Sequence, residues 1–217
     1  MLFIKRTAVL LGFVLLITSC YYTIVVLEAR NETPRIVQSI IDSDKIKLKL
    51  ADFTERQIDI LLSVQDPKFY EHKGIDLKTP GAGKTTLAQG LCKFYYFDGF
   101  KRGWDKIKLM LITRYAFDPL VTKDTQMLLI INDIYLGSYQ GQHIRGFEDA
   151  AQVYFDKTFK ELSEDEYISL VAMIRRPNGD NIKKKPKEHE LRVMRVNRFL
   201  KGEYTPQDNS DQFYDRD

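Results

Sequence analysis

The longest apolar run of the chain lies near its start. No charged residue occurs from Thr7 to Leu27, and Lys5 and Arg6 precede this run. About 20 apolar residues are enough for a helix to span a bilayer, so the pattern predicts a membrane-spanning helix. Basic residues before a span favour a cytoplasmic N-terminus, which would place the following domain outside. We therefore predict a membrane anchor over residues 1–30, in a single-pass protein of a bacterial cytoplasmic (inner) membrane with its domain facing the periplasm or outside.

A second kind of anchor is also compatible with this region. The run Ile17–Cys20 resembles the cleavage box of a bacterial lipoprotein, in which Cys20 would carry the lipid. Against this alternative, Tyr21 to Leu27 remains apolar beyond the cysteine, whereas a mature lipoprotein usually turns polar there. The pattern favours the uncleaved helix, and both alternatives keep the domain on the outer face of the same membrane.

Beyond the anchor, apolar residues recur mostly at helical spacing. Residues 31–50 are polar at first and then mixed, which indicates a linker or arm. The run Thr54–Gln57 has the composition of a helix N-terminus, and its helix would end with Gln65 and Asp66 before Pro67. Further helices are predicted over Thr85–Phe97, Trp104–Tyr115, Thr122–Tyr135, Glu148–Phe155, Ser163–Arg175 and Leu191–Leu200.

These helices predict a mainly α domain over residues 51–202. Residues 203–217 are polar and acidic and are predicted to be a disordered tail. A length of 217 residues suits one substantial core with appendages.

Charge and cysteine content restrict the function classes further. The net charge of +3 is small, which argues against a nucleic-acid-binding protein and is compatible with work beside anionic lipid. Cys20 and Cys92 lie in different helical segments, so a disulfide between them is not expected. The three histidines are scattered without ligand spacing, and neither a metal site nor a cofactor is predicted.

Four stretches carry the candidate chemistry. They are VQDPKFYEHKGID (Val64–Asp76), GKTTLAQGLCK (Gly83–Lys93), KDTQMLLIINDIYLG (Lys123–Gly137) and HIRGFEDAAQVYFDKTFKELSEDE (His143–Glu166). In this order and spacing they resemble the family 51 glycosyltransferases, the transglycosylase domain of class A penicillin-binding proteins and their monofunctional relatives. The resemblance covers about Ala51 to Leu200 and implies a lysozyme-like, two-lobed domain with a substrate cleft between the lobes.

The first stretch departs from the family at its most important position. The family pattern is E-D-x-x-F-x-x-H-x-G, in which the glutamate takes a proton from the attacking sugar hydroxyl while a lipid diphosphate leaves. Gln65 replaces that glutamate. A neutral amide cannot accept this proton, and loss of a positioned base typically costs about 10²- to 10⁴-fold in rate. The matching residues are Asp66, Phe69, His72 and Gly74.

A second glutamate of the family is also replaced. In the pattern K-x-x-I-L-E-x-Y-L-N its position is occupied by Leu128, and the tyrosine is Ile130. In the intervening R-K-x-x-E pattern Lys106 persists, but the glutamate is Leu109 or Met110. Both family glutamates are therefore degenerate here, with Asp66 the remaining acidic candidate at the catalytic position. The residues that match the longer pattern are Lys123, Asp124 and Asn132.

The second stretch fits a diphosphate-binding pattern. Gly-Lys-Thr at residues 83–85 matches the last residues of the nucleotide-binding loop pattern. That pattern also requires a glycine five residues before Gly83, where this chain has Lys78. The family pattern G-G-S-T-x-T-Q-Q matches better, and Lys93 occupies the place of a lysine that faces the substrate diphosphate. The resemblance implies a substrate-binding set of Phe69, His72, Gly74, Thr85, Thr86, Gln89, Lys93, Lys106 and Asn132.

Two surface features have open interpretations. The aromatic run Phe94–Phe97, with Phe100 and Trp104 and the adjacent Lys101 and Arg102, is either a membrane-dipping jaw or ordinary core. The basic run Lys183–Lys187 would either contact anionic lipid or be a solvated charge run.

Two functions remain compatible with these residues. The first is a catalytically impaired domain that binds lipid-linked disaccharide precursor or glycan beside other cell-wall synthesis proteins. The second is an active peptidoglycan glycosyltransferase that uses Asp66, Glu71 or Asp124 as a substitute carboxylate. Neither function involves nucleic acid.

Overall fold

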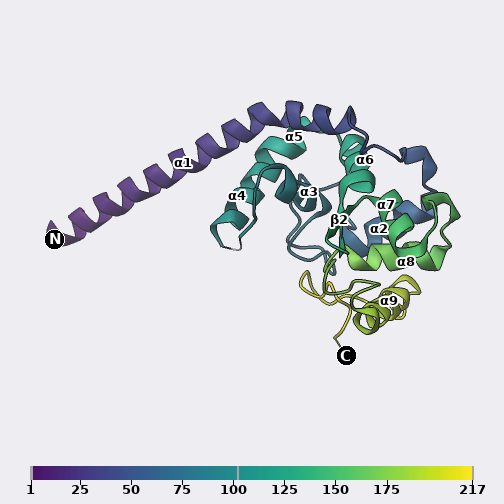
Figure 1. Ribbon diagram of the computed structural model, residues 1–217. Helices are drawn as coiled ribbons and strands as arrows, with labels where there is room; N and C mark the ends of the chain where they lie inside the picture. Colours follow the sequence, from purple (N-terminus) through teal and green to yellow (C-terminus); the bar gives the residue numbers. More distant parts are fainter. Residues whose placement is uncertain (1, 102, 217) are drawn as a thin grey trace.

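The computed structural model describes residues 2–101 and 103–216, so Met1, Arg102 and Asp217 lie outside the described residues. The fold is mainly helical and lysozyme-like with a long apolar helix at the N-terminus, which confirms the predicted fold class (Figure 1). Its elements are α1 (Leu2–Ile41), η1 (Leu50–Asp52), α2 (Glu55–Gln65), α3 (Leu87–Tyr95), α4 (Trp104–Ile112), η2 (Thr113–Phe117), α5 (Asp118–Leu120), α6 (Lys123–Asp133), β1 (Tyr135–Tyr139), β2 (Gln142–Arg145), α7 (Phe147–Phe155), η3 (Phe159–Glu161), α8 (Glu164–Met173) and α9 (Pro186–Leu200).

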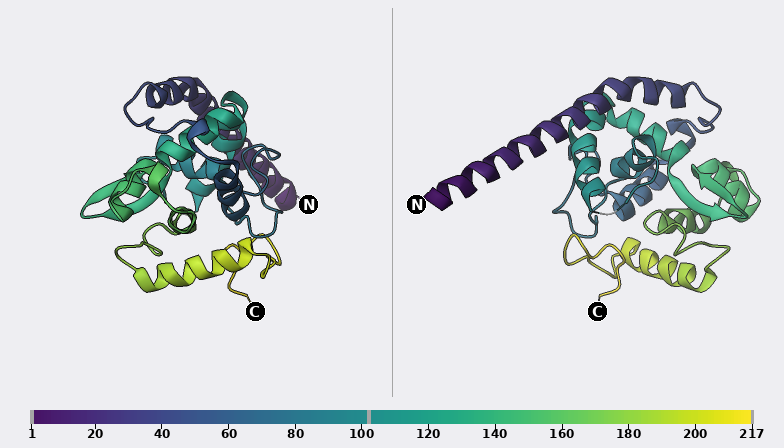
Figure 2. Two further views of the ribbon diagram at one scale, coloured as in Figure 1. Left: turned by 90° about the vertical axis from the view of Figure 1, so that its right-hand side faces the viewer. Right: turned by 60° about the vertical axis from the view of Figure 1, so that its left-hand side comes forward.

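Helix α1 is longer than the sequence pattern predicts. It continues through Pro34 to Ile41, so residues 31–41 are helical rather than a linker. The N-terminal part of α1 projects from the domain, and the later part lies along it (Figures 1 and 2). Two contacts fasten this later part: the hydroxyls of Thr33 and Tyr96 lie 2.6 Å apart, and Arg30 donates to the Tyr115 carbonyl. Tertiary contacts at α1 explain why a polar segment stays helical.

The core forms where α2, α6, α8 and the aromatic side chains around them meet. Helix α2 begins at a capping box between Thr54 and Gln57, as the sequence predicts, and α6 is buried on nearly all sides. Phe53, Phe159 and Tyr167 pack ring against ring, with Phe53 and Phe159 centroids 4.3 Å apart. This core fixes the C-terminal end of α2, which carries Gln65 and Asp66.

A short hairpin follows α6 where the sequence pattern predicts more helix. Strands β1 and β2 pair antiparallel, and α6 ends at Asp133. Gly137 has φ +96° and lies so close to the 177–181 turn that an added Cβ would be 2.6 Å from the Pro177 carbonyl oxygen. Close packing of Gly137 against a turn distant in sequence therefore favours strand over helix here, and the apolar periodicity does not reveal this contact.

Residues 203–216 pack against the domain, which corrects the predicted disordered tail. Tyr214 is 1% exposed, stacks on Phe199 with centroids 4.4 Å apart, and donates a hydrogen bond to the Val64 carbonyl at 3.2 Å. The carbonyls of Asp208 and Asn209 accept hydrogen bonds from the backbone of the 79–83 loop. The polar composition of the segment conceals these aromatic and backbone contacts, which hold it beside α9 (Figure 2).

The predicted aromatic jaw divides into two parts. Tyr96 and Phe97 pack on Ala29 of α1 and on the core, and Phe100 packs against the core edge. Phe94 and Trp104 are exposed, Trp104 by 73%. The run thus supplies core packing on one side and an exposed apolar surface on the other.

Candidate functional site

The side chain of Gln65 points into the domain. Only 2% of the residue is exposed, and its amide Nε2 donates to the Val171 carbonyl of α8 at 2.7 Å. The backbone carbonyl of Gln65 accepts a hydrogen bond from Arg175. An ionised carboxylate at this position has no hydrogen to donate, so its oxygens would lie against the Val171 carbonyl oxygen. The amide of glutamine does donate, and it therefore suits this position structurally.

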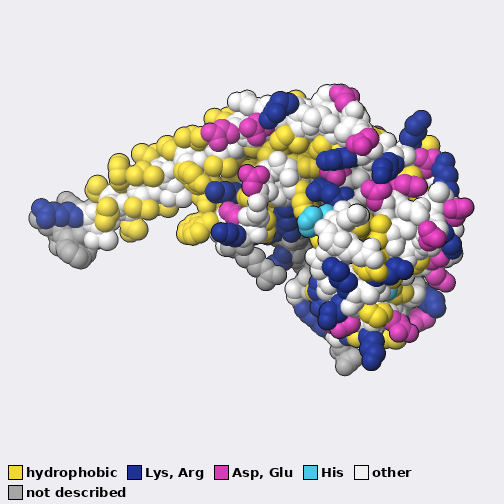
Figure 3. All heavy atoms as spheres, viewed as in Figure 1, with side chains coloured by type: hydrophobic (Ala, Val, Ile, Leu, Met, Phe, Trp, Pro, Cys, Tyr) yellow, Lys and Arg dark blue, Asp and Glu magenta, His cyan; other side chains and the backbone are white. Residues whose placement is uncertain are grey.

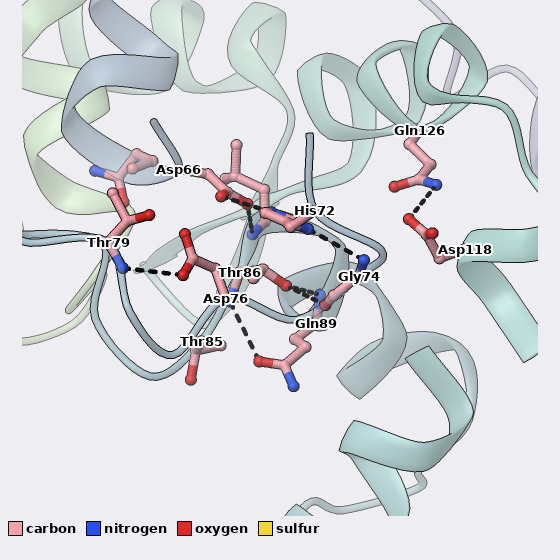
Figure 4. A network of polar contacts seen from close by, with 12 residues as sticks. Asp66, His72, Gly74, Asp76, Thr79, Thr85, Thr86, Gln89, Asp118 and Gln126 are labelled. Atoms are coloured by element: carbon pink, nitrogen blue, oxygen red, sulfur yellow. Dashed lines mark hydrogen bonds and ion pairs between the residues drawn. The ribbon is translucent and has the colours of Figure 1, made fainter. Parts of the chain in front are cut away.

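Asp66 and His72 form a buried polar pair after α2. Asp66 Oδ1 lies 2.8 Å from His72 Nε2, and Asp66 Oδ2 accepts the backbone N–H of Leu87 at 3.0 Å. His72 Nδ1 accepts the N–H of Gly74 at 3.1 Å, so the ring proton is on Nε2 and is donated to Asp66. Both carboxylate oxygens and both ring nitrogens are therefore engaged in holding the loop against the start of α3 (Figure 4).

Gly74 is where the loop comes closest to its neighbours. Its φ is +79°, and an added Cβ would lie 3.0 Å from the Thr113 carbonyl oxygen. Its own carbonyl accepts a hydrogen bond from the Thr86 hydroxyl at 2.9 Å. Glycine is required here by conformation and space.

Thr86 and Gln89 begin α3 as a capping box. The Thr86 hydroxyl accepts the Gln89 N–H, and Gln89 Oε1 accepts the Thr86 N–H, each at 3.2 Å (Figure 4). Gln89 is fully buried, and its Nε2 has no hydrogen-bond partner among the described residues. The pair positions the preceding residue, Thr85, at the edge of the domain.

Lys106 of α4 reaches this helix start. Its Nζ donates to the Lys84 carbonyl at 2.7 Å and lies 3.2 Å from the Thr85 hydroxyl and 3.3 Å from Gln89 Oε1. Burial, together with the nearby positive charge of Lys93, lowers the pKa of Lys106 to about 8. Lys106 and Lys93, which lies in the last turn of α3, thus form a basic region in front of α3, where a bound anion would relieve their repulsion.

Three other predicted site residues contact the protein itself in this structure, two by packing and one by hydrogen bonds. Phe69 is fully buried, with Lys123 Nζ 4.8 Å above its ring. The Asn132 amide binds the backbone of the arm after α1: its Oδ1 accepts the N–H groups of residues 47 and 48, and its Nδ2 donates to the Leu48 carbonyl. Leu128 is half-buried against the core and offers no proton acceptor.

A hollow of about 520 Å³ opens beside the His72 loop. It lies between residues 72–77 and the turn from α4 into η2. Lys73 and Arg114 give it positive charge, and Leu77, Met110 and Tyr115 give it an apolar wall. Met110 follows Lys106 by four residues, so the two lie on the same face of α4. This combination suits a ligand that is anionic at one end and apolar at the other.

Arg175 is a site residue that the sequence pattern does not single out. Its guanidinium donates to the carbonyls of Gln65 and Thr85 and to Gln212 Oε1. Burial lowers its pKa to about 10. Arg175 ties the end of α2 to the start of α3 and to the 203–216 segment. The pair of adjacent basic residues just after α8, Arg175 and Arg176, was the available signal in the sequence.

A profile described as Transglycosylase matches residues 33–201, which is most of the chain. The chain belongs to the transglycosylase family. Among its relatives are penicillin-binding protein 1B of Escherichia coli (strain K12), 30% identical over 170 residues, and penicillin-binding protein 1A of Neisseria cinerea, 29% identical over 157 residues. These matches cover 71% and 66% of this chain but only 20% and 19% of the relatives.

The transglycosylase domain therefore spans about a fifth of the length of the curated relatives it matches. Its N-terminal helix contains a segment, Val9–Ile41, that is long and apolar enough to cross a membrane by length and composition, and the most apolar 18 residues within it have a mean hydropathy of 2.3. This helix and the penicillin-binding relatives together indicate a single-pass inner-membrane protein.

Proposed function

We propose that this transglycosylase domain is anchored by α1, binds lipid-linked peptidoglycan precursor or glycan, and is impaired in polymerisation. The observation that carries the proposal is that the site lacks its proton acceptor but keeps its basic residues. The proton-accepting position holds Gln65, whose amide binds the Val171 carbonyl. Lys106 and Thr85 remain together at the start of α3, and Lys93, in the last turn of α3, is close enough to lower the pKa of Lys106. Cations can hold a diphosphate without a base, whereas glycosyl transfer needs both.

The contacts of the substitute carboxylates support this proposal over an active enzyme. Both oxygens of Asp66 already accept hydrogen bonds. Glu71 forms an exposed ion pair with Lys68 at 2.7 Å, and Asp124 is exposed at the first turn of α6. None of the three carboxylates takes the position of the family glutamate, which Gln65 occupies.

Binding of a lipid diphosphate is expected to weaken as the pH rises from 7 to 9.5. Lys106, with its pKa near 8, is mostly protonated at the lower pH and mostly neutral at the higher. One lost charge-assisted contact corresponds to about tenfold in affinity or somewhat more. Calorimetry of the full-length protein in detergent, with a short-chain polyprenyl diphosphate disaccharide, would measure this change.

A matched pair of variants makes the binding experiment specific. Lys106→Gln should weaken binding at pH 7 and flatten the pH dependence, whereas Lys187→Gln, an exposed lysine on α9, should leave both unchanged. Absence of detectable binding by the wild-type protein would contradict the proposal. A pH dependence that survives in Lys106→Gln would show that another group titrates.

The membrane orientation predicted from Lys5 and Arg6 has its own test. A reporter enzyme active only outside the cytoplasm, fused after Asp217, should be active, and a cytoplasm-only reporter should be silent. The mass of the protein should include residues 1–19. A cytoplasmic signal would contradict the proposed function, and a mature chain beginning at a lipid-modified Cys20 would replace the helical anchor by a lipid.

A further inference from the structure

A groove of about 380 Å³ runs between the exposed part of α1 and α4. On α1 it is lined by Ile17, Thr18, Tyr21 and Tyr22, and on α4 by Trp104 and Lys108. Lys108 Nζ lies 5.3 Å from the centre of the Tyr21 ring, and Trp104 is 73% exposed. In Figure 3 apolar side chains continue from the projecting helix onto the neighbouring edge of the domain, with basic side chains beside them.

The position of the groove along α1 determines how deep in the bilayer the groove lies. Tyr21 precedes Leu27, the last residue of the uncharged run, by six residues, which is about 9 Å along a helix. With residues 7–27 across the bilayer, the groove and the first turns of α4 lie in the outer leaflet. Trp104 and Ile107 suit that location because they are exposed and apolar. The ammonium of Lys108 does not, unless it meets an anionic group at the headgroup level.

We propose that this groove binds an anionic phospholipid of the bilayer, with the lipid phosphate on Lys108 and an acyl chain between Ile17, Tyr21 and Trp104. Among the described residues one cation, Lys108, lines the groove, which matches the single charge of a phosphodiester. A diphosphate carrier lipid needs more positive charge, and that charge is grouped elsewhere, around Lys93 and Lys106. The nearby Asp105 carboxylate is already engaged by the Lys101 N–H at 2.9 Å. This inference rests on membrane insertion of α1 but not on substrate binding or catalysis.

The chain provides its own reporter for this site, because Trp104 is its single tryptophan. The full-length protein would be reconstituted into phosphatidylcholine vesicles that contain a fixed small fraction of brominated lipid, which quenches tryptophan on contact. Brominated phosphatidylglycerol should quench Trp104 more strongly than brominated phosphatidylcholine, with a preference of roughly fivefold, as expected for one lysine beside one anionic lipid.

Variants decide whether Lys108 causes this preference. Lys108→Gln should abolish it, Lys108→Arg should retain it, and Lys201→Gln, an exposed lysine just after α9 and outside the basic run of residues 183–187, should behave as the wild type. Equal quenching by the two lipids, or a preference that survives in Lys108→Gln, would overturn the proposal. Unlabelled phosphatidylglycerol should relieve the quenching better than a polyprenyl diphosphate does; the opposite order would assign the groove to the carrier lipid instead. Circular dichroism would establish that each variant is folded.

Discussion

Purified full-length protein, supplied with lipid-linked disaccharide in detergent, is expected to form no glycan polymer above background. The position of the family base is Gln65, and its amide is held on the Val171 carbonyl at 2.7 Å. The second acidic position is Leu128, which is half-buried against the core. Loss of one positioned base typically reduces the rate about 10²- to 10⁴-fold, and loss of both glutamates should bring any product below detection on a gel.

The control for this experiment is a transglycosylase of known activity under the same conditions. Processive product from the wild-type chain, abolished by Lys106→Gln but not by Lys187→Gln, would contradict the expectation and support the alternative of an active enzyme. The single change Gln65→Glu should not restore activity. Its carboxylate would face the Val171 carbonyl, so the loss of stability relative to the wild type should be larger at neutral pH than in acid, where a protonated carboxyl can donate.

Tyr214→Ala is expected to lower the free energy of unfolding by about 3–5 kcal/mol, the range for removing a large buried aromatic side chain. Tyr214 is 1% exposed, stacks on Phe199 and donates to the Val64 carbonyl. Its removal also uncovers Arg192, whose guanidinium lies 4.9 Å from the Tyr214 ring and has no hydrogen-bond partner among the described residues. Denaturant unfolding of the detergent-solubilised protein, followed by circular dichroism, would measure the change.

Thr205→Ala is the matched control, because Thr205 lies in the same segment and is exposed. It should change the unfolding free energy by less than about 0.5 kcal/mol. A Tyr214→Ala protein as stable as the wild type would mean that residues 203–216 do not pack on the domain in solution, as composition alone predicts.

The sequence predicts most of the helices because their signals are local. The α2 capping box needs only Thr54 and Gln57, three residues apart, and the buried α6 follows from its apolar run. The orientation of Gln65 cannot be predicted in this way, since its partner, the Val171 carbonyl, lies 106 residues further along the chain. Asn132 is similar: family resemblance implies a substrate contact, whereas its amide holds a backbone segment 84 residues earlier.

Local pattern also misjudges where helices and tails end. The polar residues after Leu27 suggest a linker, but Thr33 and Arg30 face the domain and keep α1 continuous. The acidic composition of residues 203–217 suggests disorder, but one buried tyrosine and two backbone contacts to the 79–83 loop order the segment. In both cases distant contacts outweigh composition.

The continuity of α1 limits where this domain can work. A flexible tether would let a domain sweep through a volume above the bilayer and turn toward a distant target. Here the membrane helix enters the domain without interruption and is fastened there by Thr33 and Arg30, so any tilt of the helix turns the whole domain with it. The basic region in front of α3 is consequently kept at one height and one orientation, and it can meet only molecules that the lipid surface itself delivers to that height.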